Sequence, residues 1–145
     1  MRKSIFILTF VLLMPVVGLG NVGAESDIGL EEAGLTMVAL RNDSLDLNQD
    51  GDVDAVRVVV ILNSSTPSTL VDVRLIATHN DRQVIETTTI DVVGQTNASL
   101  TYDAWSRGAH ELALGFYDMN GVEISTIGLP TYEMVPALQT PMLSL

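Results

Sequence analysis

The segment Leu70-Val-Asp-Val-Arg-Leu-Ile-Ala-Thr78 alternates apolar and polar side chains with a period of two residues. The alternate positions form one apolar set (Val71, Val73, Leu75, Ala77) and one mostly polar set (Asp72, Arg74, Ile76, Thr78). This is the period of a β-strand that places one face in a hydrophobic core and the other near solvent. The segment therefore predicts a protein built from β-sheets.

Strand-like segments continue on both sides of this one, separated by turn-forming residues. Asn80-Asp81 predicts a hairpin, and Asn120-Gly121 is typical of a type I′ turn. No alternation of strands with helices is visible. The pattern predicts an all-β protein, an immunoglobulin-like β-sandwich of about seven antiparallel strands. The predicted strands are residues 35–40, 55–62, 70–78, 83–92, 98–102, 109–117 and 122–127.

The N-terminal residues 1–24 have the features of an export signal. Arg2 and Lys3 give a basic start, an apolar run extends from Ile5 to Val17, and Val22-Gly23-Ala24 offers small residues before a cleavage point. The run is shorter than the roughly 20 apolar residues that span a bilayer, so cleavage is expected and a retained anchor is the alternative. The expected organisation is a signal peptide (1–24), a linker or leading arm (25–34), the sandwich (35–130) and a C-terminal tail (131–145).

The charge of the chain excludes some partners. Without the signal, the chain keeps five Arg, no Lys and all 18 acidic residues, a net charge of −13. Such a surface repels nucleic-acid phosphates and anionic lipid, so nucleic-acid binding is not expected. Because the chain has no cysteine, an exported domain of this size must be held by its hydrophobic core, by bound ions or by both.

An acidic stretch, residues 46–54, lies directly before the predicted strand 55–62. Calcium takes six to eight oxygen ligands, and short calcium loops use side-chain oxygens at positions 1, 3 and 5 and a glycine at position 6. Gly51 occupies the glycine position. Carboxylates this close repel one another unless they are neutralised. The stretch therefore predicts a Ca²⁺ site formed by Asp46, Asn48, Asp50, Asp52 and Asp54.

The spacing does not fit an EF-hand, because position 12 requires a bidentate Glu and is Arg57 here. The pattern Asp-x-Asn-x-Asp-Gly-x-x-Asp instead resembles the loops of integrin-type and thrombospondin-type calcium repeats. That resemblance implies that Asp54 replaces the missing Glu. The alternative is a solvated acidic turn whose composition reflects turn propensity alone.

The second half of the chain, from Thr89 to Ser125, carries motifs at strand ends and turns, namely Asn97 to Trp105, Gly108 to Leu114 and Asp118 to Val122. It resembles the CARDB-type (cell-adhesion-related) immunoglobulin-like domains of prokaryotic surface proteins, in which a Trp ends one strand, a Gly-x-His or Gly-x-Tyr opens the next and an acidic hairpin closes the sandwich. The region Val56 to Leu75, whose first strand ends in Asn63, is similar to the first half of these domains. The resemblance implies contacts with other surface proteins or polymers, whereas the 46–54 stretch is not a general feature of that family.

Other chemistry-bearing residues are few. His79 and His110, the only histidines, lie at predicted strand ends without a cysteine, a carboxylate pair at ligand spacing or a Gly-x-Ser-x-Gly motif. We expect ordinary surface or edge histidines, not a zinc site or a catalytic triad. Trp105 is expected to pack at the core, with a sugar-stacking platform as the alternative. A carboxylate pair for glycoside cleavage is a remote alternative.

Three N-glycosylation sequons begin at Asn42, Asn63 and Asn97. Each is expected in a loop or at a strand end, where a glycan acceptor is accessible. Because Asn and Ser are also common in turns, the sequons alone do not establish modification.

These features predict a secreted or cell-surface immunoglobulin-like module that is not an enzyme and is stabilised by Ca²⁺. Its expected role is adhesion, assembly or binding to surface proteins or polysaccharide. A carbohydrate-binding module that uses Trp105 is the alternative. Self-association, in which the leading arm or the tail pairs with a neighbour's sheet edge, is a further alternative. No membrane span is expected after signal cleavage.

Overall fold

A computed structural model describes residues 28–136 of the chain. The predicted signal peptide (1–24) lies outside the described residues. The described part contains one short helix and eight strands. In chain order they are α1 (Ile28–Glu32), β1 (Leu35–Leu45), β2 (Ala55–Ser64), β3 (Thr69–His79), β4 (Arg82–Val92), β5 (Gln95–Asp103), β6 (Gly108–Tyr117), β7 (Glu123–Gly128) and β8 (Tyr132–Met134).

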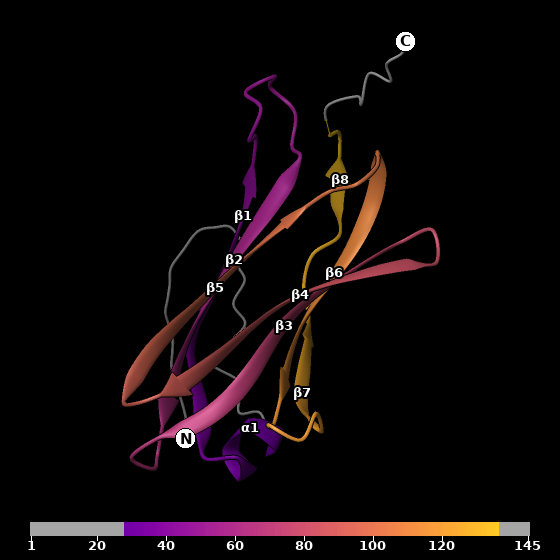
Figure 1. Cartoon of the computed structure of the whole chain (residues 1–145). Helices are drawn as coiled ribbons and strands as arrows, with labels where there is room; N and C mark the ends of the chain where they lie inside the picture. Colours follow the sequence, from indigo (N-terminus) through magenta and orange to yellow (C-terminus); the bar gives the residue numbers. More distant parts are fainter. Residues whose placement is uncertain (1–27, 137–145) are drawn as a thin grey trace.

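The strands form two antiparallel sheets that face each other (Figure 1). Sheet A has the order β1-β2-β5, and sheet B has the order β4-β3-β6-β7, with β8 pairing along β6 as well. This arrangement confirms the predicted immunoglobulin-like β-sandwich, with eight strands in place of about seven. Within the described residues, no helix is long and apolar enough to cross a bilayer.

The core lies between the two sheets and follows the period-two pattern of the sequence. In β3, the apolar set at alternate positions is fully buried, while the other set is only partly covered. β2 buries its inward side chains completely and also half-buries Val59 and Ile61 on its outer face, as expected for a central strand. The largest buried side chains that complete the core include Tyr102, Phe116, Leu35, Leu62, Leu75 and Leu114.

Two segments outside the predicted sandwich are also structured. α1 falls in the predicted linker, and its Leu30 is only 1% exposed. β8 falls in the predicted tail, and its Met134 is fully buried. Each short segment contributes one apolar side chain that joins the core cluster, and this burial explains why a segment without a clear period is ordered.

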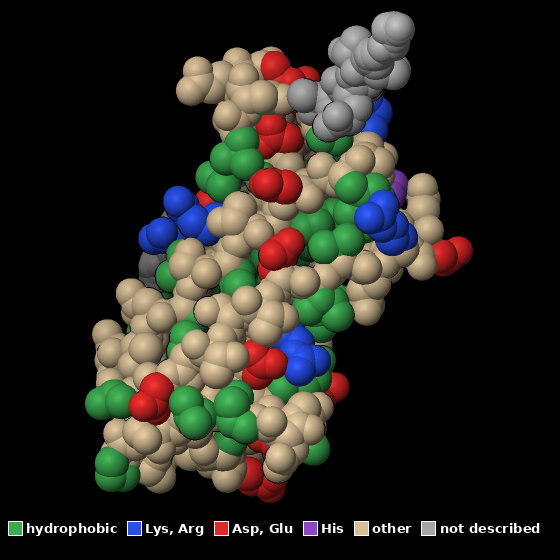
Figure 2. Space-filling view, viewed as in Figure 1, with side chains coloured by type: hydrophobic (Ala, Val, Ile, Leu, Met, Phe, Trp, Pro, Cys, Tyr) green, Lys and Arg blue, Asp and Glu red, His purple; other side chains and the backbone are tan. Residues whose placement is uncertain are grey.

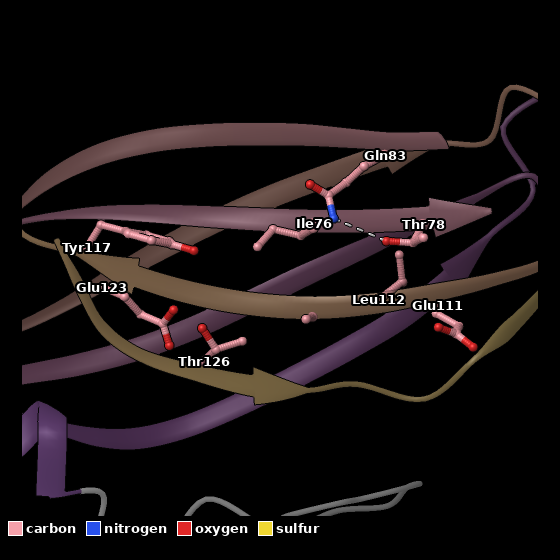
Figure 3. Close-up of a pocket in the computed structure, with 9 residues that line it drawn as sticks. Ile76, Thr78, Gln83, Glu111, Leu112, Tyr117, Glu123 and Thr126 are labelled. Carbon is pink, nitrogen blue, oxygen red and sulfur yellow. Dashed lines mark hydrogen bonds between the residues drawn. The ribbon is translucent and has the colours of Figure 1, made fainter. Parts of the chain in front are cut away.

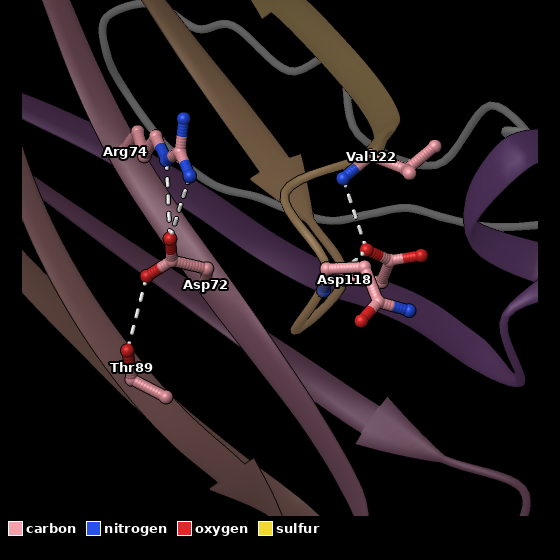
Figure 4. Close-up of polar contacts among 6 residues, drawn as sticks. Asp72, Arg74, Thr89, Asp118 and Val122 are labelled. Carbon is pink, nitrogen blue, oxygen red and sulfur yellow. Dashed lines mark hydrogen bonds and ion pairs between the residues drawn. The ribbon is translucent and has the colours of Figure 1, made fainter.

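The two predicted hairpin turns have different outcomes. Asn80 and Asp81 both have positive φ and connect the paired residues His79 and Arg82, so this is the two-residue turn with the I′ conformation. The type I′ prediction for Asn120-Gly121 is wrong, because only Gly121 has positive φ. The Asp118 carboxylate instead accepts the N–H groups of Asn120 and Val122 at 2.8 and 2.9 Å and holds a longer turn (Figure 4).

Candidate functional site

The connection between β1 and β2, residues 46–54, is the acidic loop. It begins after the last β1–β2 pair, Leu45 with Ala55. The acidic loop lies at the end of the sandwich opposite α1 (Figure 1). Acidic side chains are spread over the face of the molecule in Figure 2, including the end that carries this loop. Asp50 and Asp52 are exposed, Asp46 is half-buried, and Asp54 is buried at 8% exposure.

Side-chain oxygens of the acidic loop turn onto its own backbone. The Asp46 carboxylate accepts the N–H groups of Asp50 and Gly51 at 3.1 and 2.7 Å. The Asn48 side-chain oxygen also accepts the Asp50 N–H at 3.1 Å, and an Asp50 carboxylate oxygen accepts the Asp52 N–H at 2.9 Å. Gly51, with a φ of +94°, allows the sharp bend. The alternating oxygens of the sequence thus gather along the inside of one tight loop.

Asp54 closes the acidic loop and connects it to neighbouring segments at the same end of the sandwich. Its two carboxylate oxygens accept the N–H groups of Leu47 and Asn48 at 2.8 and 3.3 Å. Its backbone carbonyl accepts the Ala104 N–H at 3.0 Å, which links the loop to the β5–β6 turn. The carbonyl of the preceding residue, Val53, accepts the N–H of Val135 at 2.7 Å, just after β8. Asp54 therefore braces this end of the sandwich in two ways: its carboxylate holds the acidic loop closed, and its backbone carbonyl connects the loop to the β5–β6 turn.

The donor set of the acidic loop fits a hard cation such as Ca²⁺ in its chemistry, because it offers carboxylate and amide oxygens and no nitrogen or sulfur ligand. Backbone N–H groups already supply part of the neutralisation that the carboxylates need. A carboxylate has about four lone-pair sites, so Asp46 and Asp50 retain acceptor capacity beyond these bonds. In the described residues, no three or more His, Cys, Asp or Glu side chains converge in a group that could hold a metal ion. Calcium binding by the loop stays a prediction.

A cluster of four rings, the histidine cluster, lies at the same end as the acidic loop. Its members are His79, Tyr102, Trp105 and His110. His79 and His110 are stacked in parallel, with ring centroids 4.3 Å apart and an interplanar angle of 2°. The Trp105 ring contacts both edge-on, at 5.8 and 4.9 Å. Ala104, next to Trp105, donates the hydrogen bond to Asp54, so the histidine cluster and the acidic loop share a backbone link.

The prediction of a surface or edge histidine is wrong for His110, whose exposure is 0%. The reason is its register in β6, where His110 shares the inward face with Leu112, Leu114 and Phe116. His79 is half-buried at the end of β3. The period-two pattern of β6 could have predicted this burial, because His110 lies two residues before the buried Leu112 and therefore on the same face of the strand.

Hydrogen bonds to backbone carbonyls identify a ring nitrogen that carries a hydrogen in each histidine. His110 Nε2 lies 2.9 Å from the Ser106 carbonyl, which can only accept, so Nε2 carries the hydrogen and Nδ1 accepts the Tyr102 hydroxyl at 2.7 Å. By the same logic, His79 Nδ1 donates to the Ala109 carbonyl at 2.7 Å, and its Nε2 accepts from the Asn80 amide at 3.2 Å.

Burial lowers the pKa of His110 below its usual value of 6.5, and the proximity of His79 lowers it further. The hydrogen bond to Ser106 and the charge of Glu133 act in the opposite direction. Burial also raises the pKa of the Tyr102 hydroxyl, which keeps it a hydrogen-bond donor to His110. Both shifts favour the neutral, hydrogen-bonded pair.

Acidification is expected to destabilise the fold through His110. Because the folded pKa is below the unfolded value of about 6.5, the unfolded chain binds the proton first. The contribution of neutral His110 is therefore complete above about pH 6.5 and is lost as the pH falls toward the lowered folded pKa. Urea unfolding at pH 7.5 and 5.5 measures this loss. It should persist in His79→Gln and shrink in His110→Gln, and an equal loss in both variants would contradict the assignment.

Trp105 is half-buried and packs against the core, which confirms the predicted core position. The Arg82 guanidinium lies 4.9 Å from the centroid of its ring. Nearby, Gly108 has a φ of +126°, and a Cβ there would lie 2.8 Å from Cε1 of His79. Arg82 thus covers a face of the Trp105 ring, the two histidines meet the ring edge-on, and the turn that carries Trp105 requires glycine at position 108.

The outer face of sheet B carries a shallow groove of about 380 Å³ (Figure 3). Ile76 and Tyr117 contribute apolar surface, and Glu111, Glu123 and Thr126 contribute polar groups. Glu111 pairs with Thr78 in the sheet register, whereas Glu123 pairs with Tyr117, six residues further along β6. At about 3.3 Å per residue, the two positions are offset by roughly 20 Å along the strand direction.

Beside the groove, Arg74 is held by its neighbours (Figure 4). Its guanidinium lies 3.0 Å from an Asp72 oxygen and 4.0 Å from the centroid of the Tyr117 ring. The Thr89 hydroxyl donates to the other Asp72 oxygen at 3.0 Å. The positive charge of Arg74 is therefore neutralised locally, and the groove keeps an acidic character from Glu111 and Glu123.

Together, the fold and the site define an immunoglobulin-like β-sandwich with an acidic loop braced against a buried histidine cluster. No protein-family model matches the chain, and no curated protein matches its sequence. The resemblances to CARDB-type domains and to calcium-binding repeats thus stay predictions that rest on the motifs.

Proposed function

We propose that the protein is an exported, non-enzymatic immunoglobulin-like module whose acidic loop binds Ca²⁺ and stabilises one end of the sandwich. The observation that carries this proposal is the inward turn of the Asp46, Asn48 and Asp50 oxygens within a loop that Asp54 braces against the β5–β6 turn. A cation bound by the remaining lone pairs of these oxygens, with backbone carbonyls and water, would stiffen the entry to β2.

Calcium is expected to raise the melting temperature of the protein. At tenfold excess over a Kd in the 10⁻⁴ to 10⁻³ M range of extracellular modules, binding adds about 1.4 kcal/mol to the free energy of unfolding. Thermal unfolding with added calcium and with EGTA measures the difference. Asp50→Ala should abolish it, and Glu86→Ala, on the distant strand β4, should keep it. A melting temperature that calcium does not change would refute the calcium part of the proposal.

The arrangement of acids and histidines supports a non-enzymatic role. Glycoside hydrolases hold their two carboxylates about 5 to 9.5 Å apart, whereas Glu111 and Glu123 of the groove are separated by six positions along β6. His110 is fully buried, and both of its ring nitrogens are hydrogen-bonded, one to Tyr102 and the other to Ser106. It therefore offers no nitrogen to a substrate. A general hydrolase panel checks this point, and turnover by the purified chain would overturn it.

The proposed partners are surface proteins or polysaccharides. The groove on sheet B offers Tyr117, Thr126 and two acids, a surface suited to hydroxyl-rich or cationic ligands rather than anions. The packing of Trp105 among His79, His110 and Arg82 does not favour the alternative of a sugar platform on that ring. A glycan array read with and without calcium separates the two, because binding lost in Trp105→Ala but kept in Tyr117→Ala would support the platform.

Features of two sheet edges oppose self-association. β1 has a register shift between Met37 and Ala39. Glu86 lies opposite the buried residue Leu75 and is itself exposed, so it places a charge on that side of edge strand β4. Bulges and charged side chains on edge strands discourage the addition of another strand. We therefore propose contacts through the sheet faces, and size exclusion at high concentration tests this against edge pairing.

A further inference from the structure

The three sequons occupy different environments, although all three asparagines lie within strands rather than in loops. N-glycosylation requires an Asn side-chain amide and, two residues on, a hydroxyl that are both accessible. The three sites can therefore be ranked by the exposure and the hydrogen bonds of these two side chains.

Asn42 is the least available. It lies in β1 opposite Val58, whose side chain is 2% exposed, so Asn42 faces the core side of the sheet. Its side chain is half-buried, and its side-chain oxygen accepts a hydrogen bond from the Tyr132 hydroxyl of β8. A glycan at this position would separate β8 from β1.

The Asn63 side chain is exposed, but its sequon is less accessible to modification than that exposure alone indicates. It lies near the end of β2, the central strand of sheet A, between Thr36 and Gln95. The hydroxyl of its sequon, Ser65, donates to the Gly34 carbonyl at 3.3 Å. The backbone around Asn63 is thus paired on both sides, and the hydroxyl is engaged.

Asn97 is open at both positions. It lies in β5, at the edge of sheet A, and residues two apart in a strand share a face, so Asn97 and Ser99 point outward together. Both are exposed, and within residues 28–136 neither side chain makes a hydrogen bond. We propose that Asn97 is an N-glycan acceptor and that Asn42 is not.

A glycan at Asn97 would also cover apolar surface. In the register of sheet A, Asn97 lies beside Ile61, and Ser99 beside Val59. These are the two half-buried apolar side chains on the outer face of β2. Asn63 is the diagonal neighbour of Asn97, at about 7–8 Å. A glycan on Asn97 would crowd that position, so one glycan per chain is expected.

The proposed glycosylation of Asn97 rests on the proposed export of the chain, and the following experiment tests the two separately. The whole chain is expressed in a host that N-glycosylates secreted proteins, once as it stands and once behind the host's own secretion signal. Intact mass and peptide mass spectrometry should find one glycan, at Asn97, in the second form. A glycan in the second form but not the first would contradict export by the chain's own leader and leave the Asn97 site supported.

Variants of the exposed hydroxyl provide matched controls. Ser99→Ala should remove the glycan completely, Ser99→Thr should keep it, and Asn63→Gln should leave the mass of the glycan unchanged. Because Asn63 and Ser99 are exposed, all these variants should keep the melting temperature of the unmodified chain. An unchanged melting temperature would show that loss of the glycan is not caused by misfolding. An unmodified Asn97 behind the host signal, or a glycan on Asn42, would overturn the proposal.

Discussion

Replacing His110 with Ala is expected to lower the free energy of unfolding by about 3–5 kcal/mol at neutral pH. The change leaves a cavity where a fully buried ring packed, and such losses of a large core side chain cost about this much. It also leaves the Tyr102 hydroxyl and the Ser106 carbonyl without their partner, which adds to the cost. Urea unfolding of the variant at pH 7.5 measures the effect.

Two comparisons test the sources of this loss of stability, the first for burial of the ring and the second for the hydrogen bond to Tyr102. His79→Ala should cost less, about 1–2 kcal/mol, because His79 is half-buried. In a double-mutant cycle, Tyr102→Phe should cost less in the His110→Ala background than in the native chain, by about 1 kcal/mol. Strict additivity of the two changes would mean that the Tyr102–His110 bond contributes nothing.

Replacing Asp54 with Ala is expected to lower the free energy of unfolding by about 2–4 kcal/mol, in EGTA as well as in calcium. Its carboxylate makes two bonds to loop amides from a buried position, and hydrogen bonds to charged groups contribute about 1.5–3 kcal/mol each. This separates Asp54 from Asp50, whose replacement should act mainly through calcium.

Asp52 provides the matched control for Asp54. It belongs to the same acidic loop and carries the same charge, but it is exposed, and in the described structure its carboxylate accepts no hydrogen bond. Asp52→Ala should therefore change the stability in EGTA by less than about 0.5 kcal/mol. If Asp54→Ala were equally mild in EGTA, the bracing role of Asp54 would be refuted.

The fold was predictable because its central strands carry a strong local pattern. The alternation in 70–78 and the apolar run 55–62 correspond to β3 and β2, each extended by one or two residues at its ends. β8 was not predictable, because three residues contain too little periodicity and their order depends on pairing with Gly108 to His110 in β6. The strand boundaries of β1 and β5 likewise depend on partners distant in sequence.

The candidate site was predictable only in part. The alternating oxygens of residues 46–54 indicated a tight loop whose side chains turn inward, and the structure has this form. The bracing bonds of Asp54 involve Ala104, fifty residues away, and no local pattern encodes such a contact. The stacking of His79 on His110 depends on the packing of β3 beside β6, so it becomes visible only in three dimensions.

The placement of β8 has a mechanical consequence. α1 and β8 lie toward opposite ends of the sandwich (Figure 1), so a pull between residues 28 and 136 acts along its long axis. β8 holds β6 through only three residue pairs, whereas β1 and β2 share a ladder along their whole length. The short ladder would part first, together with the bond from Val135 to Val53. Force along this axis would therefore act on the end of the sandwich that carries the acidic loop before it opened the long β1–β2 ladder.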